Sequence, residues 1–344
     1  MHAVVIHAPK DLRIDTLPDA PAPGPGQVRV KIAAGGICGS DLHYYHHGGF
    51  GVVRIQEPMA LGHEIAGTVD AIGAGVSHLA IGARIAVSPS LPCRACVHCR
   101  AGMRNQCLDM RFYGSAMRMP HVQGGFRQSL TVEAEQAIPI PDHLSMGEAA
   151  MAEPLAVCLH AANRAGPLMG KRVLVTGAGP IGALCILVAK LGGASDIVVT
   201  DIADGTLAMA AKLGATRTVN VRGGTEGLAD LKADKGLVDV LFEASGNQAA
   251  VIAALDVMKP GGVLVQLGLG GEMTLPMNTI VAKELQIRGT FRFDPEFALA
   301  VELMGKGLID VKPLITATLP YASAVEAFEL ASDRSKSMKV QLAF

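Results

Sequence analysis

A glycine-rich turn between a β-branched run and an apolar stretch constrains the fold of this chain more than any other feature. Residues 173–182 read Val-Leu-Val-Thr-Gly-Ala-Gly-Pro-Ile-Gly, a strand that runs into the pattern G-x-G-x-x-G and then into a helix. Gly177 permits the tight turn, Gly179 lets the backbone approach a ligand phosphate, and Gly182 lets the helix pack closely on the strand. Such a turn is typical of a parallel α/β sheet.

From about residue 151 onward, β-branched runs alternate with apolar stretches of helical length. This alternation is typical of parallel strands whose crossover connections are helices. We therefore expect a doubly wound parallel (Rossmann) sheet in residues 151–290. The predicted strands span residues 171–176, 196–201, 238–243 and 262–267, and the predicted helices span residues 182–191, 206–213 and 248–258.

Asp201, at the end of the second predicted strand, indicates a dinucleotide ligand. It lies roughly 20 residues after the glycine turn, where a carboxylate accepts hydrogen bonds from the adenosine ribose hydroxyls. Residues 202–206 contain no Arg or Lys to neutralise a 2′-phosphate, so NAD is favoured over NADP. The alternative is a generic turn followed by an unrelated strand-end aspartate. The predicted cofactor-binding residues are Gly177, Gly179, Pro180, Ile181, Gly182 and Asp201.

Residues 1–150 lack this alternation and read as short strands broken by Gly and Pro. We expect a β-rich, partly open barrel there, with strands over residues 1–6, 27–32, 64–72 and 84–87. Residues 291–344 are too few for a third domain, so we expect them to fold back onto the first one. Their predicted elements are helices over residues 295–304 and 322–332 and a strand over residues 339–344.

Four of the seven cysteines form the pattern Cys93-x2-Cys96-x2-Cys99-x7-Cys107. Four thiolates at such short spacing can surround one tetrahedral zinc ion and leave no open position, as in a structural site. In a reducing compartment this clustering favours a metal over disulfides. His98 is then a solvated neighbour, because the sulfurs already complete the shell. The pattern predicts a structural zinc lobe over about residues 90–110.

A second metal site is predicted around residues 35–45, which pack a thiol, a hydroxyl, a carboxylate and an imidazole behind two glycines. Cys38 is a candidate ligand, although a buried cysteine beside a glycine turn is often inert. His63 and Glu64 stand side by side, and Glu153 lies where the domains are expected to meet. With Cys38 they give a mixed sulfur, nitrogen and oxygen set with room for water or substrate, as a catalytic zinc requires.

On these motifs the chain resembles the zinc-dependent medium-chain alcohol dehydrogenases over essentially its whole length. Within that family it is most similar to the polyol branch, the sorbitol and xylitol dehydrogenases, and there to the bacterial L-idonate 5-dehydrogenases. The resemblance implies a GroES-like catalytic domain joined to a Rossmann NAD-binding domain, with one catalytic and one structural zinc per subunit. The shared segments are GGICGSDLHYY (35–45), NQCLDMRFYGSA (105–116), PHVQGGF (120–126), AEPLAV (152–157) and KVQLAF (339–344).

The resemblance also implies roles for the metal ligands. Cys38 and His63 match zinc ligands, and Glu64 matches the ligand glutamate of sorbitol-type enzymes. Glu153 matches the third protein ligand of the alcohol branch, whereas polyol enzymes use this glutamate to hold water or substrate. Whether Glu64 or Glu153 contacts the resting metal stays open. The residues that match the structural lobe are Cys93, Cys96, Cys99 and Cys107.

Five further residues match positions around the catalytic metal of the family. Asp41 would orient the histidine ligand. Ser40 matches the hydroxyl that takes the substrate proton, and His43 is next in the relay. Tyr44 and Arg292 match substrate-contacting positions. Arg292 is the candidate partner for a substrate carboxylate, and its alternative role is a structural ion pair.

Together these residues imply oxidation of a secondary alcohol of a sugar acid, with hydride transfer to NAD. For L-idonate the product would be 5-keto-D-gluconate. The alternative substrate is an uncharged polyol such as sorbitol, xylitol or galactitol, because a fold does not fix the chemistry of its pocket. A third interpretation, a catalytically inactive dinucleotide-binding protein, is disfavoured because the ligand and relay residues are all present.

Composition argues against several other classes of protein. The net charge of −1 gives no reason to expect binding to nucleic acid or to a membrane surface. No apolar run approaches the length of a membrane span and the first residues lack a signal-peptide pattern, so a cytoplasmic location is expected. The resemblance implies a homodimer or homotetramer, paired through the strand near residues 284–291.

Overall fold

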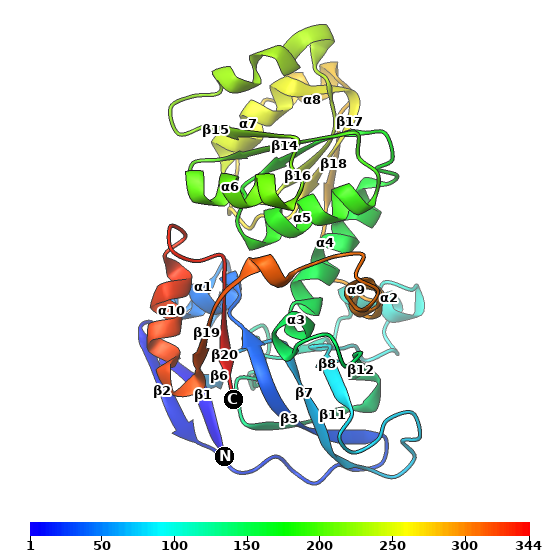
Figure 1. Ribbon diagram of the computed structural model, residues 1–344, viewed down its shortest axis with the longest axis vertical. Coiled ribbons are helices and arrows are strands. Elements are labelled where there is room, and N and C mark those ends of the chain that lie inside the picture. Colours follow the sequence, from blue (N-terminus) through cyan, green and yellow to red (C-terminus); the bar gives the residue numbers. More distant parts are fainter. The chain divides into compact units, whose positions relative to one another are not determined.

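The computed structural model describes all residues 1–344 and divides the chain into two compact units (Figure 1). The first unit contains Met1–Glu153, Asp294–Gly307 and Val311–Phe344. The second contains Pro154–Phe293 and Leu308–Asp310. The sequence predicts domain boundaries at residues 150 and 290. In the structure the main boundaries between the two units follow Glu153 and Phe293.

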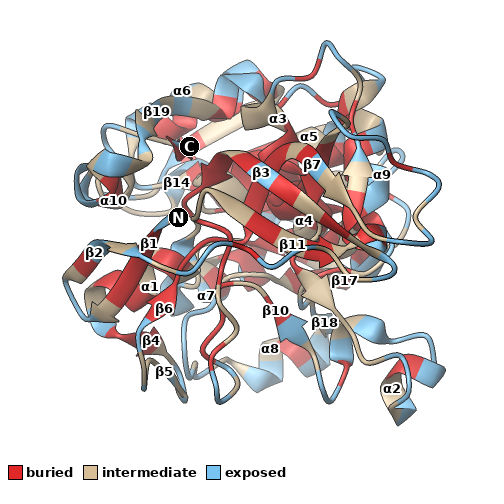
Figure 2. Cartoon of the chain, turned by 90° about the horizontal axis from the view of Figure 1, so that it is seen from below, coloured by how far each residue is buried: buried red, intermediate tan, exposed pale blue.

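The first unit is built around β3 (Gln27–Gly36), which lies inside a seven-stranded sheet. Val28, Val30 and Ile32 are buried whereas Lys31 is exposed, as the two-residue period of a strand requires. Figure 2 shows β3 and β7 with many buried residues. The strands in spatial order are β12 (Ala137–Pro139), β8 (Arg84–Val87), β7 (Glu64–Ile72), β3, β20 (Lys339–Ala343) and β19 (Ile315–Pro320), with β11 (Ser129–Glu133) also paired to β3.

The last strand of the chain completes the sheet that the N-terminal part begins. β20 runs antiparallel to the end of β3, with Gln341 opposite Gly36. The smaller sheets contain β2 (Asp11–Thr16), β1 (His2–Ala8) and β6 (Met59–Ala60); β9 (Ser90–Leu91) and β10 (Arg111–Phe112); and β4 (Gly49–Phe50) and β5 (Val53–Arg54). The helices are α1 (Gly39–His47), α2 (Val97–Arg100), α3 (Met146–Ala150), α9 (Glu296–Gly305) and α10 (Ala324–Ser332), and α4 (Ala152–Ala165) begins here and continues into the second unit.

Helix α1 differs from the prediction, which expects only strands and turns before residue 150. Its sequence, GSDLHYYHH, carries no apolar stripe, so hydrophobic periodicity does not mark it. The helix is instead defined at its two ends. The carboxylate of Asp41 accepts a hydrogen bond from the backbone N–H of Cys38 at 3.0 Å, and Gly48, with φ of 68°, ends the helix in the left-handed conformation.

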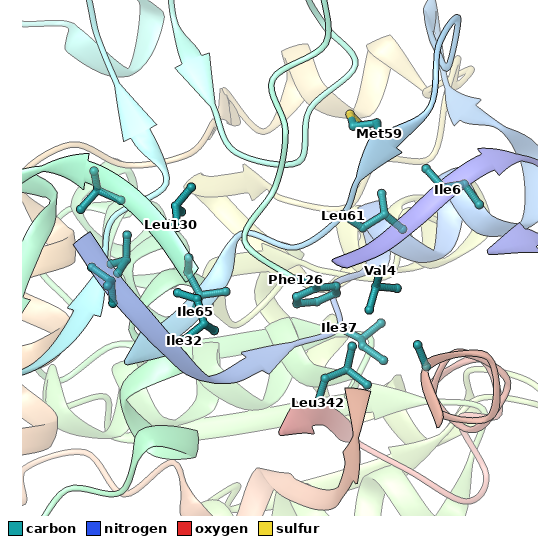
Figure 3. Close-up of a cluster of buried hydrophobic side chains, with 14 of the residues drawn as sticks. Val4, Ile6, Ile32, Ile37, Met59, Leu61, Ile65, Phe126, Leu130 and Leu342 are labelled. Carbon is teal, nitrogen blue, oxygen red and sulfur yellow. The ribbon is translucent and has the colours of Figure 1, made fainter. Parts of the chain in front are cut away.

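A continuous apolar core supports the start of this helix. Figure 3 shows Phe126, Leu61, Ile37 and Leu342 gathered in that core. Ile37 immediately precedes Cys38, and its backbone N–H donates to the carbonyl of Val340 at 3.0 Å. Burying a side chain of the size of Ile37 stabilises the folded state by about 1.5–3 kcal/mol. This burial and the hydrogen bond to Val340 together anchor the backbone that carries Cys38.

The second unit confirms the predicted doubly wound sheet. Its six strands are all parallel, in the order β15-β14-β13-β16-β17-β18. The chain order reverses on either side of β13, and ligands bind such sheets at the carboxyl ends of the strands beside this reversal. The strands are β13 (Arg172–Thr176), β14 (Asp196–Asp201), β15 (Arg217–Asn220), β16 (Val238–Glu243), β17 (Met258–Gln266) and β18 (Gln286–Gly289); the helices are α5 (Pro180–Leu191), α6 (Asp204–Leu213), α7 (Gln248–Val257) and α8 (Met277–Ala282). None of the helices in either unit combines the length and the apolarity needed to cross a membrane.

Candidate functional site

The carboxylate of Asp41 joins two chain segments that are distant in sequence. One oxygen accepts the backbone N–H of Cys38 at 3.0 Å, and the other accepts the backbone N–H of Gly62 at 3.2 Å. The side chain is fully buried. Because a single carboxylate binds both segments, Cys38 at the start of α1 and His63 beside Gly62 are brought close together.

Gly62 sets the direction in which His63 leaves the turn before β7. Its φ is 92°, and a Cβ at this position would lie 2.1 Å from the ring of Phe126. Only glycine adopts this conformation without strain and leaves room for the aromatic ring. The ring of His63 then lies 5.5 Å from the ring of Phe112, between centroids, and is almost fully buried.

The candidate metal-binding atoms of Cys38, His63 and Glu64 lie within 4.8 Å of one another. Zinc takes sulfur, nitrogen and oxygen ligands at about 2.0–2.3 Å, which such a spacing allows. Nδ1 of His63 is buried without a hydrogen-bond partner, and it lies 3.8 Å from a carboxylate oxygen of Asp41. Because buried polar atoms are nearly always paired, this orphan nitrogen and the mixed donor set fit a site that a metal ion completes.

Glu153 lies near this group, in the first turn of α4, but outside the compact set of three. Burial raises the pKa of Glu153 to about 8, and the neighbouring Cys38 and Glu64 add to the rise. The structure therefore brings together all four candidate ligands that the sequence predicts, with Glu64 closer than Glu153 to Cys38 and His63.

Lys339, which no sequence motif indicates as a site residue, lies in the middle of these acidic groups. Its ammonium donates to the two carboxylate oxygens of Glu64 at 2.7 and 2.8 Å and to the carbonyl of Ile37 at 3.1 Å. Burial alone would lower the pKa of Lys339, but Glu64 and then Cys38 raise it above its ordinary value. One feature of the sequence could have indicated Lys339 as a buried charge: it is the first residue of a terminal strand whose other residues are largely apolar.

The site carries more acidic groups than one ammonium can balance. Burial and then the charge of Glu64 raise the pKa of Cys38 to about 11. Burial also raises the pKa of Asp41. A divalent cation stabilises coordinating thiolates and carboxylates, so this excess of acidic groups is what a zinc site requires.

Ser40 and His43 lie one helical turn apart on α1, both half-buried. Residues three apart share a helix face, so the two side chains can follow one another in a path. The ring of His43 lies 6.0 Å from the ring of Phe50 and 6.2 Å from that of His47, between centroids. Burial, followed by the charge of His47, lowers the pKa of His43.

The two predicted substrate contacts have different environments. Tyr44 is 1% exposed, and its hydroxyl oxygen accepts the backbone N–H of Ala116 at 3.0 Å. Its hydroxyl thus supports the segment around Ala116 from within the core. Arg292 belongs to the second unit, has φ of 54°, and stacks its guanidinium over the ring of Phe291 at 4.8 Å. Contact of either residue with substrate stays a prediction.

The four clustered cysteines also converge, with sulfur atoms within 4.8 Å of one another. Backbone N–H groups point at these sulfurs: that of Cys93 donates to Cys107 at 3.1 Å, and that of Cys96 donates to Cys93 at 3.3 Å. Such bonds favour the thiolate, and the N–H of Cys99 is the main reason that the pKa of Cys96 falls to about 6. His98 lies outside the set of four. This donor set fits a closed tetrahedral zinc site.

The glycine turn after β13 leaves open backbone where a phosphate would approach. Gly177 has φ of 85°, and a Cβ there would lie 2.9 Å from the backbone of Ser245. Nothing lies within 4 Å of the Cβ position of Gly179, the N-cap of α5. Pro180 at the first helical position starts the helix two residues earlier than predicted, because its φ suits that position. A Cβ on Gly182 would collide with the carbonyl of Gly177, so only glycine lets the helix pack this closely on the turn. With open backbone at Gly179 and a helix N-terminus behind it, the turn fits the pyrophosphate of a dinucleotide.

Asp201 is fixed at the end of β14 by three backbone N–H groups. One carboxylate oxygen accepts from Ile202 at 2.7 Å and from Ala203 at 2.9 Å. The other accepts from Ala178, in the glycine turn, at 2.7 Å. The bond from Ala178 holds Asp201 beside the glycine turn. A ribose bound between Asp201 and the turn would contact both.

Two known protein families match the chain. Residues 24–142 match the alcohol dehydrogenase GroES-like domain, and residues 180–306 match the zinc-binding dehydrogenase family. The L-idonate 5-dehydrogenase (NAD(P)(+)) of Escherichia coli K12 is 45% identical over 316 residues, covering 92% of this chain and 91% of that protein. The chain belongs to the zinc-binding alcohol dehydrogenase family.

Further relatives agree with this assignment. The sorbitol dehydrogenase of Gallus gallus is 38% identical over 344 residues, covering 99% of this dehydrogenase and 95% of that protein. The crystal structure of L-idonate 5-dehydrogenase from Escherichia coli K-12 superimposes with a TM-score of 0.94 at 42% identity, covering 100% of this chain and 98% of that chain. These relationships confirm the predicted GroES-like and Rossmann domains, and the predicted class, an oxidoreductase that binds zinc and NAD(P).

Proposed function

We propose that this dehydrogenase oxidises the C5 hydroxyl of L-idonate to 5-keto-D-gluconate, with NAD as the preferred hydride acceptor. The observation that carries the catalytic part is the convergence of Cys38, His63 and Glu64 within 4.8 Å of one another. The substrate rests on the similarity to L-idonate 5-dehydrogenase, at 45% identity. Asp201, beside the glycine turn, supports the preference for NAD.

The proposal places one catalytic and one structural zinc in each subunit. Cys38, His63 and Glu64 would hold the catalytic ion, with Glu153 beside it to hold water or substrate. When bound, zinc supplies a Lewis acid that lowers the pKa of the substrate hydroxyl, and NAD supplies the hydride acceptor. The structural ion would be held by Cys93, Cys96, Cys99 and Cys107.

The chain's own residues orient the ligands and move the proton. Asp41 fixes the segments that carry the thiol and the imidazole. Ser40 takes the proton of the substrate hydroxyl, and His43 passes it toward solvent. Because burial lowers the pKa of His43, the ring is neutral and able to accept that proton near neutral pH.

Initial rates of NADH formation with L-idonate, sorbitol, xylitol and galactitol test the substrate. We expect kcat/KM to be at least about tenfold higher for L-idonate, because a charge-assisted bond to its carboxylate contributes about 1.5–3 kcal/mol. Reduction of NAD with none of the four by zinc-replete protein would contradict the proposed activity. A preference for sorbitol would overturn the substrate alone.

Oxidation of an uncharged polyol is the second candidate function. The observation that favours it is the similarity to a sorbitol dehydrogenase along 99% of this chain. Arg292 separates the two candidates, since we propose it as the partner of the sugar-acid carboxylate. Arg292→Ala should lower kcat/KM for L-idonate about tenfold and leave sorbitol within about twofold. An equal loss for both substrates would assign Arg292 a structural role.

We also propose that the dehydrogenase is a homodimer or homotetramer paired through β18. This strand is the edge of the six-stranded sheet, where backbone N–H and C=O groups are open to pairing with another chain. Ile287 on β18 is 44% exposed, and Phe291 nearby is 41% exposed. Ile287→Asp should shift the mass measured by light scattering toward the monomer, and a monomeric parent protein would refute the proposal.

A further inference from the structure

A fully buried carboxylate lies at the carboxyl end of the six-stranded sheet without an ion-pair partner. It belongs to Glu243, the last residue of β16. In the parallel register its neighbours are Thr176, which ends β13, and Gln266, which ends β17. This row of three polar residues therefore crosses the point between β13 and β16 where the strand order reverses.

Glu243 binds neutral groups from three segments of the chain. After β16, the backbone N–H groups of Ser245 and Gly246 donate to its Oε1 at 2.9 and 3.0 Å, and the hydroxyl of Ser245 donates to the same oxygen. The hydroxyl of Thr176 donates at 3.3 Å, and the amide of Gln266 donates to Oε2 at 2.5 Å. Because backbone and amide N–H groups can only donate, these partners fit an ionised carboxylate.

The same contacts hold the glycine turn and two loops close to this charge. A Cβ on Gly268, after β17, would lie 2.2 Å from the backbone nitrogen of Gly246 and 2.7 Å from Oε2 of Glu243. A Cβ on Gly177, in the glycine turn, would lie 2.9 Å from the backbone of Ser245. The glycine turn and the loops after β16 and β17 are therefore packed around one buried negative charge.

The nicotinamide part of the cofactor belongs to this half of the sheet. A doubly wound sheet binds a dinucleotide across the reversal point, with one nucleotide on each half. Asp201 on β14 is the proposed partner of the adenosine ribose, which leaves the ends of β16 and β17 for the nicotinamide. The nicotinamide ring carries a positive charge in NAD⁺ and none in NADH, so a negative charge at this edge attracts the ring of the oxidised form alone.

We propose that Glu243 strengthens the binding of the oxidised over the reduced cofactor, by holding a buried negative charge without a cationic partner beside the nicotinamide site. The inference rests on the proposed placement of the dinucleotide along Asp201 and the glycine turn. Glu243 needs no contact with the ring, because Coulomb interactions act over several ångströms in a poorly solvated interior.

Equilibrium titrations of the zinc-loaded protein with NAD⁺, NADH and ADP-ribose, in the absence of substrate, test this role. ADP-ribose lacks only the nicotinamide ring and therefore reports on the rest of the site. Glu243→Gln keeps the size of the side chain and removes its charge, so the affinity for NAD⁺ relative to NADH should fall about fivefold. Loosening of the turn would lower all three affinities together, and it divides out of this ratio.

Three further variants separate the charge from the packing. Gln266→Lys keeps the carboxylate but supplies a cation beside it, so the ratio should fall as in Glu243→Gln. Glu243→Asp keeps the charge on a shorter side chain and should keep the ratio even where all three affinities fall. Asp239→Asn is the matched control, because it removes a carboxylate that pairs with Lys259 near the start of the same strand, and it should leave the ratio unchanged.

The possible results distinguish this inference from the proposed function. Equal losses of all three affinities in Glu243→Gln, or an unchanged ratio in Gln266→Lys, would overturn the role of Glu243 and leave the proposed function in place. If Glu243→Gln does not fold, the ratio in Gln266→Lys decides. A parent protein that binds none of the three ligands would refute the proposed function itself, and this inference with it.

Discussion

Lys339 donates to both carboxylate oxygens of Glu64, at 2.7 and 2.8 Å, although the two residues lie 275 positions apart in the chain. Both side chains are buried. Glu64 would therefore have two alternative positive partners, the ammonium and a metal ion held with Cys38 and His63. We expect the strength of the ion pair to influence how firmly Glu64 would bind that metal and how readily a substrate oxygen would replace the carboxylate there.

Replacing Lys339 tests this competition. Lys339→Met leaves Glu64 without its ammonium, so Glu64 should bind the metal more firmly and KM for substrate should rise about tenfold. In metal-free protein, removing one partner of a buried ion pair should cost about 3–5 kcal/mol of unfolding free energy. The d–d bands of Co²⁺-substituted protein measure the change at the metal, initial rates measure KM, and urea unfolding measures the loss of stability.

Two variants control for simple loss of packing. Lys339→Arg keeps the charge and should retain most of the affinity for substrate. Lys339→Met combined with Glu64→Gln removes the unpaired carboxylate and should restore part of the lost stability. Unchanged Co²⁺ bands together with unchanged unfolding in Lys339→Met would contradict the account.

Asp41→Asn tests the residue that joins the two ligand segments. An amide presents one acceptor oxygen instead of two, so either Cys38 or Gly62 loses its contact. We expect the affinity for the catalytic zinc to fall about 10–100-fold in a chelator titration. Asp70→Asn is the matched control, because Asp70 makes an exposed ion pair with Arg29. Equal effects of the two substitutions would show that Asp41 does not position the site.

The cysteine lobe should hold its zinc independently of catalysis. Cys96→Ser should reduce the metal content from about two zinc ions per chain to about one and lower Tm, while the remaining zinc supports turnover. Cys185→Ser, a buried cysteine in α5, should change Tm without changing metal content. A Cys96→Ser protein that keeps its full zinc content would contradict the structural assignment.

The pH profile should report the environment of His43. Burial, followed by the charges of His47 and Arg334, lowers the pKa of His43 below its ordinary value of 6.5. More than half of the His43 rings are therefore neutral at pH 6.5, and the loss of kcat on acidification should be centred below pH 6.5. His47→Asn removes a repelling charge and should move this loss to higher pH, whereas His43→Asn should abolish it. A profile that is the same in all three proteins would remove His43 from the relay.

Elements with a clear hydrophobic period could be predicted closely from the sequence. The strands at residues 64–72, 84–87, 196–201 and 238–243 have the same limits in the structure. Their alternating or continuously apolar residues face a core, which is the signal that periodicity measures. The candidate metal ligands could be proposed for a different reason, since their residue types and spacing are chemically restrictive.

The contacts between distant segments could not be predicted in this way. The pairing of Lys339 with Glu64 depends on the register of β20 against β3 and on the register of β3 against β7. Both are properties of the folded sheet. Helix α1 escaped prediction because it is stabilised at its ends rather than by an apolar stripe.

Anomalous diffraction at the zinc absorption edge tests the central claim most directly. We predict two peaks per chain: one bounded by Cys38, His63 and Glu64, and one bounded by the four cysteines of the lobe. Absence of a peak at Cys38 from a zinc-replete and active protein would contradict the catalytic site described above.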